Sequence, residues 1–370
     1  MPQIRKITLA ELWDFVRSEH YQKLPVLPIS EQRALSYIHN PRAEAEDAVM
    51  FLAYENDQLA GYRVTLPDQI NVDGNMEHMG WYSCVWVDPN MRGKGIAKQM
   101  VEHTLEAWQQ RILLQNPIPA SEALYRGSGL FPRDNYRQGF RGYFRPEFSK
   151  ILSSKGGIFK ALGPAWSIAD WLAKPVNSIR LGLSASKFNV DPASFQAVTN
   201  FDDRDDELLS QLDSKDLTRK RSIDLNWWIN YPWVLSSSLQ DRTSSRYYFS
   251  AIDDRFEFLP FRLFDASGNQ NGLILFSIRG RELRTAYARL ERANIPAVAS
   301  LIASLMYQLN LATFTTFSAE LVKHFEKNGG YFMFQKSLRR LYLVSKVFDQ
   351  EEVNMDVLRF QDGDGDAAFT

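Results

Sequence analysis

The residues best suited to chemistry are Arg92-Gly93-Lys94-Gly95-Ile96-Ala97, where two basic side chains alternate with two glycines. We expect a helix to begin within this run. A helix N-terminus leaves backbone N–H groups unpaired and carries a partial positive charge. Glycine lets the backbone approach an anion closely, and Arg92 and Lys94 add full charges. The run therefore predicts a binding site for a pyrophosphate group.

Two elements must position this run. Before it, residues 79–87 are apolar and predict a buried strand. After it, the segment from Gly95 to about Arg111 repeats apolar residues close to a 3.6-residue period, which predicts an amphipathic helix. The helix would carry its apolar face at Ile96, Met100, Val101, Leu105 and Trp108.

Two familiar phosphate-binding motifs do not fit. A Walker loop needs Ser or Thr after its lysine, and Gly95 follows Lys94. The dinucleotide fingerprint G-x-G-x-x-G needs a third glycine where this chain has Lys98. The pattern R-x-x-G-x-A after an apolar strand and V-x-P closely resembles the motif of the GCN5-related N-acetyltransferases, and it covers residues 81–108.

This resemblance implies an α/β fold with a mixed sheet and binding of acetyl-coenzyme A as the acyl donor. The turn at Arg92–Ala97 would hold the pyrophosphate of the coenzyme. In this family a bulge in the preceding strand presents a backbone N–H to the thioester carbonyl. By resemblance that donor falls at Val85 to Val87, with Val87 preferred.

Acyl transfer to an amine also needs a base and an acid. Family members often carry the base as a carboxylate on the strand before the turn, but residues 80–87 contain no carboxylate. Glu77 and His78, just upstream, are the candidates. The acid is often a tyrosine in the pattern Y-x-x-x-G-F. Tyr136 is the candidate here, although its spacing to Gly139-Phe140 is one residue shorter.

Residues 1–148 have the expected order of elements for one such domain. Thr8 and Glu11 form a capping box, residues 49–54 and 59–66 form a hairpin, residues 123–130 form a strand, and residues 132–138 form a short helix.

Residues 149–187 differ in composition and are interpreted as an inter-domain arm. Residues 188–350 predict a second, degenerate copy of the same fold, with a helix over 296–309 followed by a strand over 312–317. At the position that corresponds to the turn, this copy has no glycine, and Glu291 would repel phosphate. Residues 351–370 are acidic, with three aspartates between 362 and 366, and predict a flexible tail.

Composition excludes several other classes of function. The net charge of −1 gives no bulk attraction for nucleic acid. The single cysteine, Cys84, rules out an internal disulfide, and the dispersed histidines indicate no metal site. The N-terminus shows no secretory signal, and the uncharged stretch 294–318 is too polar for a membrane span, so a cytoplasmic protein is expected.

The sequence therefore predicts two tandem domains and the transfer of an acetyl or other short acyl group to a small-molecule or peptide amine by direct attack. Three alternatives remain open. The first is a non-catalytic protein that binds or senses acyl-coenzyme A, and the second is an aminoacyl transferase of the tandem-domain type that acts on cell-wall precursors. The third is a structural or interaction protein in which the turn is vestigial. The acceptor and the oligomeric state cannot be read from the sequence.

Overall fold

The computed structural model describes residues 2–149, 157, 161–183, 190–212, 215–237, 246–351 and 353–370. The chain folds into two compact units, and neither of them is a continuous stretch of sequence. Unit 1 contains residues 1–137, 199–258 and 340–370, and unit 2 contains residues 138–198 and 259–339.

Unit 1 is built on a mixed sheet. Strands β1 to β4 are antiparallel neighbours in chain order, and β5 lies parallel to β4. The end of β14 pairs with β5, with Leu343 opposite Leu114. The bounds of these strands are β1 (Gln3–Thr8), β2 (Ala48–Glu55), β3 (Gln58–Val72), β4 (Asn75–Val87), β5 (Ile112–Gln115) and β14 (Phe334–Val344). A separate parallel pair is formed by β8 (Leu235–Ser236) and β9 (Ile252–Asp253).

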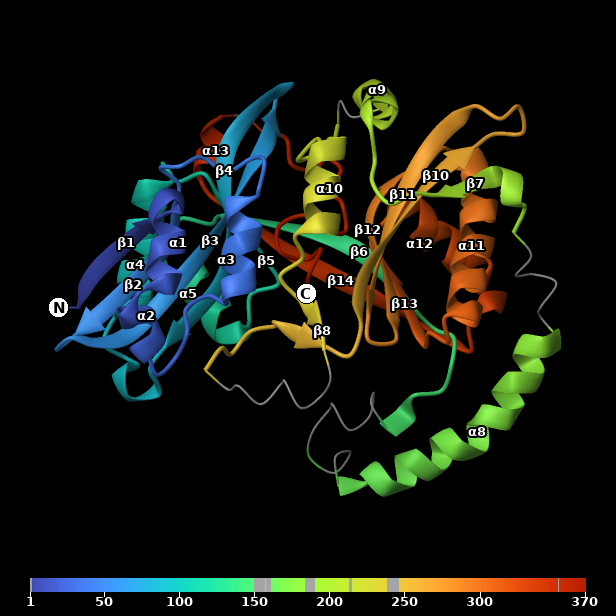
Figure 1. Ribbon diagram of the computed structural model, residues 1–370, viewed down its shortest axis with the longest axis horizontal. Helices are drawn as coiled ribbons and strands as arrows, with labels where there is room; N and C mark the ends of the chain where they lie inside the picture. Colours follow the sequence, from blue (N-terminus) through green and yellow to red (C-terminus); the bar gives the residue numbers. More distant parts are fainter. Residues whose placement is uncertain are drawn as a thin grey trace. The chain divides into compact units, whose positions relative to one another are not determined.

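Helices cover the strands of unit 1. The first helix begins at the predicted capping box, where the Glu11 carboxylate accepts a hydrogen bond of 2.8 Å from the Thr8 N–H. In Figure 1, α1 and α3 lie beside each other in front of the sheet, whereas α4 packs on β2, β3 and β4. The helices of this unit are α1 (Leu9–Arg17), α2 (Glu19–Lys23), α3 (Glu31–Ile38), α4 (Ile96–Ala107), α5 (Pro119–Gly127), α9 (Asp203–Leu212), α10 (Ser222–Asn230) and α13 (Val347–Gln350).

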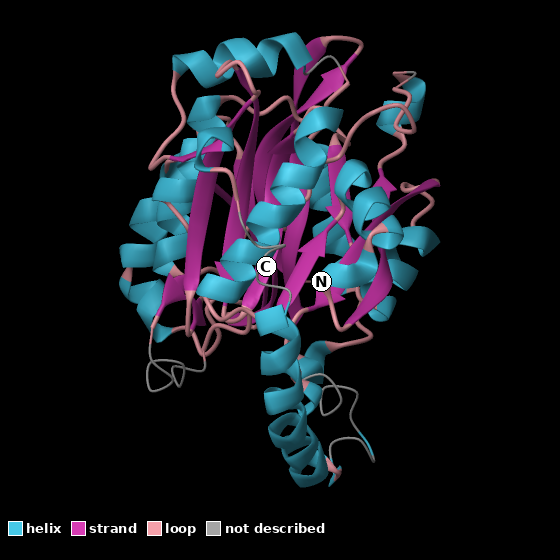
Figure 2. Ribbon diagram, turned by 90° about the vertical axis from the view of Figure 1, so that its right-hand side faces the viewer, coloured by secondary structure: helices cyan, strands magenta, loops and turns pink. Residues whose placement is uncertain are grey.

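Unit 2 repeats the strand–helix–strand connection of unit 1. Strands β10, β11 and β12 precede α11, and β13 then lies parallel to β12. Val298, Ile302 and Met306 of α11 are fully buried in the core of this unit. Its elements are β6 (Arg133–Tyr143), α8 (Gly163–Leu183), β7 (Phe195–Ala197), β10 (Phe256–Phe264), β11 (Gln270–Arg279), β12 (Glu282–Arg289), α11 (Ile295–Gln308), β13 (Thr313–Thr316) and α12 (Ala319–Lys327). Within this unit, α8 extends away from the strands in both views (Figures 1 and 2).

Each unit takes a strand from the opposite half of the sequence. In unit 1, β5 pairs with residues 342–344 of β14. In unit 2, β13 pairs with residues 140–143 of β6. The predicted divisions after residues 148 and 350 follow chain order, whereas the compact units do not, because each sheet includes a strand that is distant in sequence. The predicted division after residue 187 lies outside the described residues.

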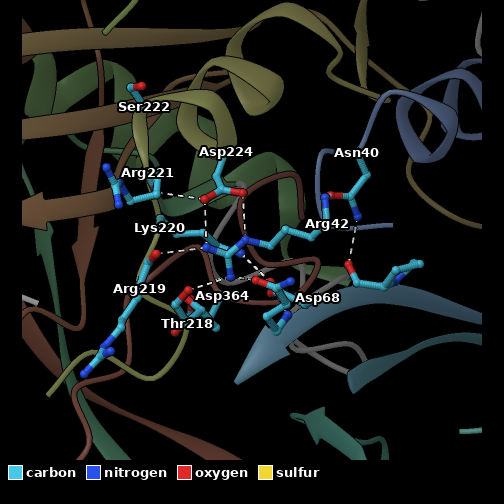
Figure 3. Close-up of polar contacts among 12 residues, drawn as sticks. Asn40, Arg42, Asp68, Thr218, Arg219, Lys220, Arg221, Ser222, Asp224 and Asp364 are labelled. Carbon is cyan, nitrogen blue, oxygen red and sulfur yellow. Dashed lines mark hydrogen bonds and ion pairs between the residues drawn. The ribbon is translucent and has the colours of Figure 1, made fainter. Parts of the chain in front are cut away.

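A buried ionic network fixes residues 218–224 against β3 in unit 1 (Figure 3). The Arg42 guanidinium donates to both carboxylate oxygens of Asp224 at 2.7 Å and to Asp68 at 3.0 Å. Lys220 Nζ lies 2.7 Å from the same Asp68 carboxylate. Burial alone would raise the pKa of Asp68, but the positive charges of Lys220 and Arg42 outweigh it and hold this pKa below its usual value. These paired charges hold residues 218–224 in unit 1, although these residues come after the predicted first domain in the sequence.

The prediction of a flexible tail is wrong for residues 353–370, which are packed into unit 1. Phe369 is fully buried, and its ring centroid lies 3.8 Å from that of Trp233. The Asp364 carboxylate accepts hydrogen bonds from Thr218 Oγ1 at 2.7 Å and from the Gln361 N–H at 2.8 Å. The acidic composition predicted a solvated segment. The hydrogen bonds to Asp364 and the packing of Phe369 on Trp233 instead hold this segment in the fold.

Two local predictions are also wrong. Residues 119–127 form helix α5 rather than the predicted strand over 123–130, and residues 133–143 form strand β6 rather than beginning with a short helix. Pro119 occupies the first turn of α5, and Glu122 is acidic in that turn, so both fit the start of a helix. In the part of the chain that the structure describes, no helix combines the length and the apolar character that crossing a bilayer requires.

Candidate active site

The glycine-rich turn has the backbone geometry that close contact with an anion requires. Gly93 and Gly95 have φ angles of +81° and +79°, a region that side chains other than glycine strain to reach. No atom lies within 4 Å of the position that a Cβ would take at either glycine. Gly95 is the N-cap of α4, so the N–H groups of the first turn of this helix point out of the turn.

The side chains of the turn have two roles: some are buried in the core, and others carry charge at the surface. Ile96 is buried beside Met100, Ala53 and Ala60, so only its backbone is available to a ligand. Arg92 and Lys94 are exposed. Lys94 Nζ lies 3.7 Å from a Glu55 carboxylate oxygen, a distance at which an exposed pair contributes little. The predicted run therefore places two cations and a helix N-terminus at one point of the surface.

The strand before the turn is irregular. In the β3–β4 ladder, Arg63 faces Val85 but Thr65 faces Tyr82, so two residues of β4 lie opposite Val64. This is a β-bulge at Ser83–Cys84, and it is two residues earlier than the predicted donor region of Val85 to Val87.

At the bulge, β4 separates from β5. Their parallel pairing runs from Gly80 opposite Ile112 to Tyr82 opposite Leu114 and then stops. A cavity of about 310 Å³ lies in unit 1 where the two strands diverge, and its walls come from β4, β5, α5, β14 and the C-terminal segment. It is lined by Tyr82, Ser83, Val85, Leu114, Gln115, Asn116, Pro117, Ile118, Ser121, Tyr125, Phe249, Arg340, Asp366, Ala367 and Thr370.

Tyr125 of α5 contributes a phenol to this cavity. Its side chain is buried, and its hydroxyl oxygen accepts a hydrogen bond of 2.9 Å from Arg63 Nη2. Because the oxygen is the acceptor in this bond, the phenol proton can be donated to another group. The sequence analysis missed Tyr125 because residues 123–130 were assigned to a strand. The signal was present: Tyr125 stands four residues before Gly129-Leu130, which is the Y-x-x-x-G spacing with Leu in place of Phe.

Tyr136 does not line the cavity. It lies on β6, its side chain is 37% exposed, and its hydroxyl is 3.3 Å from an Asp134 carboxylate oxygen. The family motif places its tyrosine in a helix, whereas Tyr136 lies in a strand. The short spacing from Tyr136 to Gly139 therefore belongs to a strand and not to the helix that the motif implied.

Glu77 and His78 lie at the opposite end of β4 from the turn. Glu77 accepts a hydrogen bond of 2.8 Å from Arg111. His78 Nε2 lies 2.7 Å from an Asp47 carboxylate oxygen. Burial alone would lower the pKa of His78, but the hydrogen bond and charge of Asp47 raise it above its usual value. Both side chains are thus engaged in ion pairs, away from the cavity.

His78 also belongs to a group with metal-ligand chemistry. Glu44, Asp47 and His78 place one ligand atom each within 4.8 Å of the others, and this is the one such group found among the described residues. The hydrogen bond between His78 and Asp47 accounts for their closeness without an ion. Cys84 is buried as predicted, and burial raises the pKa of its thiol, which makes it a poor nucleophile.

Comparison with known proteins agrees with this geometry. A family model described as an acetyltransferase (GNAT) domain matches residues 4–131. No curated protein sequence matches the chain.

Several solved structures are similar to this chain at low sequence identity. A probable N-acyltransferase from Enterococcus faecalis V583 has a TM-score of 0.50 and 11% identity, over 94% of this chain and 73% of that chain. A GCN5-related N-acetyltransferase from Anabaena variabilis has a TM-score of 0.46 and 15% identity, over 94% and 74%. The N-myristoyltransferase of Saccharomyces cerevisiae, solved with myristoyl-CoA and inhibitors, has a TM-score of 0.49 and 9% identity, over 93% and 80%.

Proposed function

We propose that the chain transfers an acetyl group from acetyl-coenzyme A to a primary amine, since residues 4–131 match a family model described as an acetyltransferase (GNAT) domain. This proposal is supported by the succession, along β4, of a cavity, a bulge and a glycine-rich turn at a helix N-terminus within one compact unit. Acyl transfer from coenzyme A needs these three features in this order, because the thioester and the pyrophosphate are at different points of one long donor.

The turn would bind the donor through its pyrophosphate. The backbone N–H groups at the start of α4 would donate hydrogen bonds to the phosphate oxygens, and Arg92 and Lys94 would neutralise their charge. The open space beside Gly93 and Gly95 leaves room for those oxygens. Coenzyme A supplies the thioester, whose carbonyl carbon is the electrophile of the reaction.

The bulged part of β4 would polarise the thioester. A bulge frees backbone groups from the ladder. We place the oxyanion donor at Val85 to Val87 and favour Val85, since it is the member of this stretch that lines the cavity. A donor fixed in a strand needs little reorganisation as negative charge develops on the oxygen.

Tyr125 would protonate the leaving thiolate. Its phenol lines the cavity, and the phenol oxygen accepts the hydrogen bond from Arg63, so the phenol proton can be donated to the sulfur. This assignment replaces Tyr136 as the acid, because Tyr136 does not reach the cavity.

Steady-state thiol release tests the proposal. The protein is incubated with acetyl-coenzyme A and a panel of primary amines, and free thiol is measured over time. Turnover that depends on one class of amine supports the proposed function. Saturable binding of acetyl-coenzyme A without amine-dependent thiol release would instead identify a non-catalytic sensor.

A further inference from the structure

We propose that Asp366, which lies 283 positions after Ser83 in the sequence, is the catalytic carboxylate that binds the ammonium group of the acceptor and takes its proton. This inference rests on the proposed function. The starting point is that residues 80–87 of β4 contain no carboxylate, although acyl transfer to an amine requires a proton acceptor near the thioester.

The structure brings a carboxylate from elsewhere to this strand. Asp366 Oδ2 accepts a hydrogen bond of 2.5 Å from Ser83 Oγ, at the bulge of β4. Asp366 Oδ1 accepts one of 3.0 Å from Gln115 Nε2, on β5. The carboxylate is thus held between the two strands whose separation forms the cavity.

The carboxylate faces the cavity and remains accessible. Among the described residues that line the cavity, Asp366 alone has an acidic side chain. That side chain is 21% exposed. A carboxylate has about four acceptor positions, and Ser83 and Gln115 use two of them, so acceptors remain for the N–H groups of an ammonium.

The nearest positive charge does not block the carboxylate. Arg33 Nη2, on α3, lies 3.9 Å from Asp366 Oδ2, beyond hydrogen-bond distance. Arg33 Nη2 donates shorter hydrogen bonds to Ser83 Oγ at 2.5 Å and to the Tyr37 hydroxyl at 3.0 Å. Arg340 of β14, Tyr125 of α5 and Tyr82 of β4 are the other titratable side chains among the described residues that line the cavity. We therefore assign Arg33 as a positioning residue that orients Ser83.

The segment that carries Asp366 is fixed on both sides. Gly365 has a φ of +67°, and a Cβ there would come within 3.0 Å of the Trp81 ring, so the backbone lies directly on β4. Asp364 is anchored on Thr218 and Phe369 on Trp233. These contacts fix the segment on both sides of Asp366.

The chemical step follows from this placement. Asp366 accepts one proton from the acceptor's ammonium group, and the neutral nitrogen forms a bond to the thioester carbonyl carbon. The C–S bond breaks as Tyr125 gives its proton to the sulfur. The second proton that leaves the nitrogen restores the Tyr125 phenol, so one proton is released for each amide and each free thiol formed. The substrate class is a primary amine that is cationic in solution.

The test compares Asp366→Asn with the control Asp356→Asn, an exposed aspartate in the same segment. Three quantities are measured for each variant: acetyl-coenzyme A affinity by calorimetry, the thermal midpoint, and the pH profile of kcat/KM for thiol release. We expect Asp366→Asn to keep its affinity and to lose about 100-fold or more in kcat, together with the acidic limb of the profile. The control should match the wild type.

A second variant keeps the proposal testable if Asp366→Asn fails to fold. Ser83→Ala keeps the carboxylate but removes one of the two hydrogen bonds that fix its position, so kcat should fall while acetyl-coenzyme A affinity is unchanged. Full turnover by a folded Asp366→Asn variant, or an unchanged kcat in Ser83→Ala, would overturn the assignment. A wild-type protein that neither binds acetyl-coenzyme A nor releases thiol would overturn the proposed function, and this assignment with it.

Discussion

Ser83 donates a 2.5 Å hydrogen bond to Asp366, and this single contact joins the bulge of β4 to the last part of the described chain. Ser83 stands beside the divergence of β4 and β5, where the cavity begins. The carboxylate and the bulge are therefore within one hydrogen bond of each other although they are far apart in sequence. The proposed site depends on the C-terminal segment as much as on the glycine-rich turn.

The first prediction concerns the turn. Gly95→Glu should abolish acetyl-coenzyme A binding, because the new side chain places a negative charge and a strained backbone where the pyrophosphate would bind. Calorimetry measures the loss. Gly268→Glu is the matched control, since Gly268 has a φ of +80° and open space around its Cβ position in unit 2. Equal effects of the two substitutions on affinity would contradict the assignment.

The second prediction separates the two tyrosines. Tyr125→Phe removes the proposed proton donor and should lower kcat by about 10²-fold or more while leaving acetyl-coenzyme A affinity unchanged. Tyr136→Phe alters an exposed hydroxyl outside the cavity and should leave kcat unchanged. Steady-state thiol release measures both. The reverse ranking would restore Tyr136 as the acid.

The third prediction concerns the buried ionic network. Arg42→Ala leaves the buried Asp68 and Asp224 carboxylates without their shared partner, and it should reduce the free energy of unfolding by roughly 3–5 kcal/mol. Lys23→Ala is the control, because the Lys23–Glu19 pair is exposed and should contribute almost nothing. Urea denaturation followed by circular dichroism gives both values. A small effect of Arg42→Ala would show that the network does not hold residues 218–224 in place.

The fourth prediction is a pH dependence of stability. Burial raises the pKa of Asp364 to about 7, against the opposing charge of Lys220 and the hydrogen bond from Thr218. The unfolded value is about 3.9. A raised folded pKa means that the stabilisation is fully present below the unfolded value and is lost as the pH rises through 7.

The measurement compares Asp364→Asn, which cannot ionise, with the wild type. Between pH 6 and pH 8, the wild type should lose about 1 kcal/mol more of its free energy of unfolding than the variant loses. Denaturation curves at both pH values test this difference. Parallel pH dependences in the two proteins would show that Asp364 does not titrate in this range.

The sequence predicts well the parts of the fold that depend on local physics. The β2–β3 hairpin, β4 and α4 follow from hydrophobic periodicity, and the turn follows from the positions of Gly93 and Gly95. These features are encoded within a few residues, so no distant contact is needed to recognise them. The helix α11 and strand β13 of unit 2 follow for the same reason.

Features that depend on distant contacts were missed. The apolar stretch around Tyr125 suits either a strand or a helix, and periodicity does not separate the two in so short a segment. The run from Asp362 to Asp366 resembles a solvated tail until its donors are known, and those donors lie on Ser83, Gln115 and Thr218. The pairing of β5 with β14 likewise has no local signal. The proposed acid, Tyr125, and the proposed base, Asp366, therefore depend on tertiary contacts.

We propose above all that this chain binds one acetyl-coenzyme A at the glycine-rich turn in order to acylate an amine. The decisive measurement is a calorimetric titration of the 370-residue protein with acetyl-coenzyme A. We expect saturable binding at one site per chain, because the corresponding turn before α11 has no glycine and carries Glu291. The absence of binding, or binding that Gly95→Glu leaves intact, would contradict it.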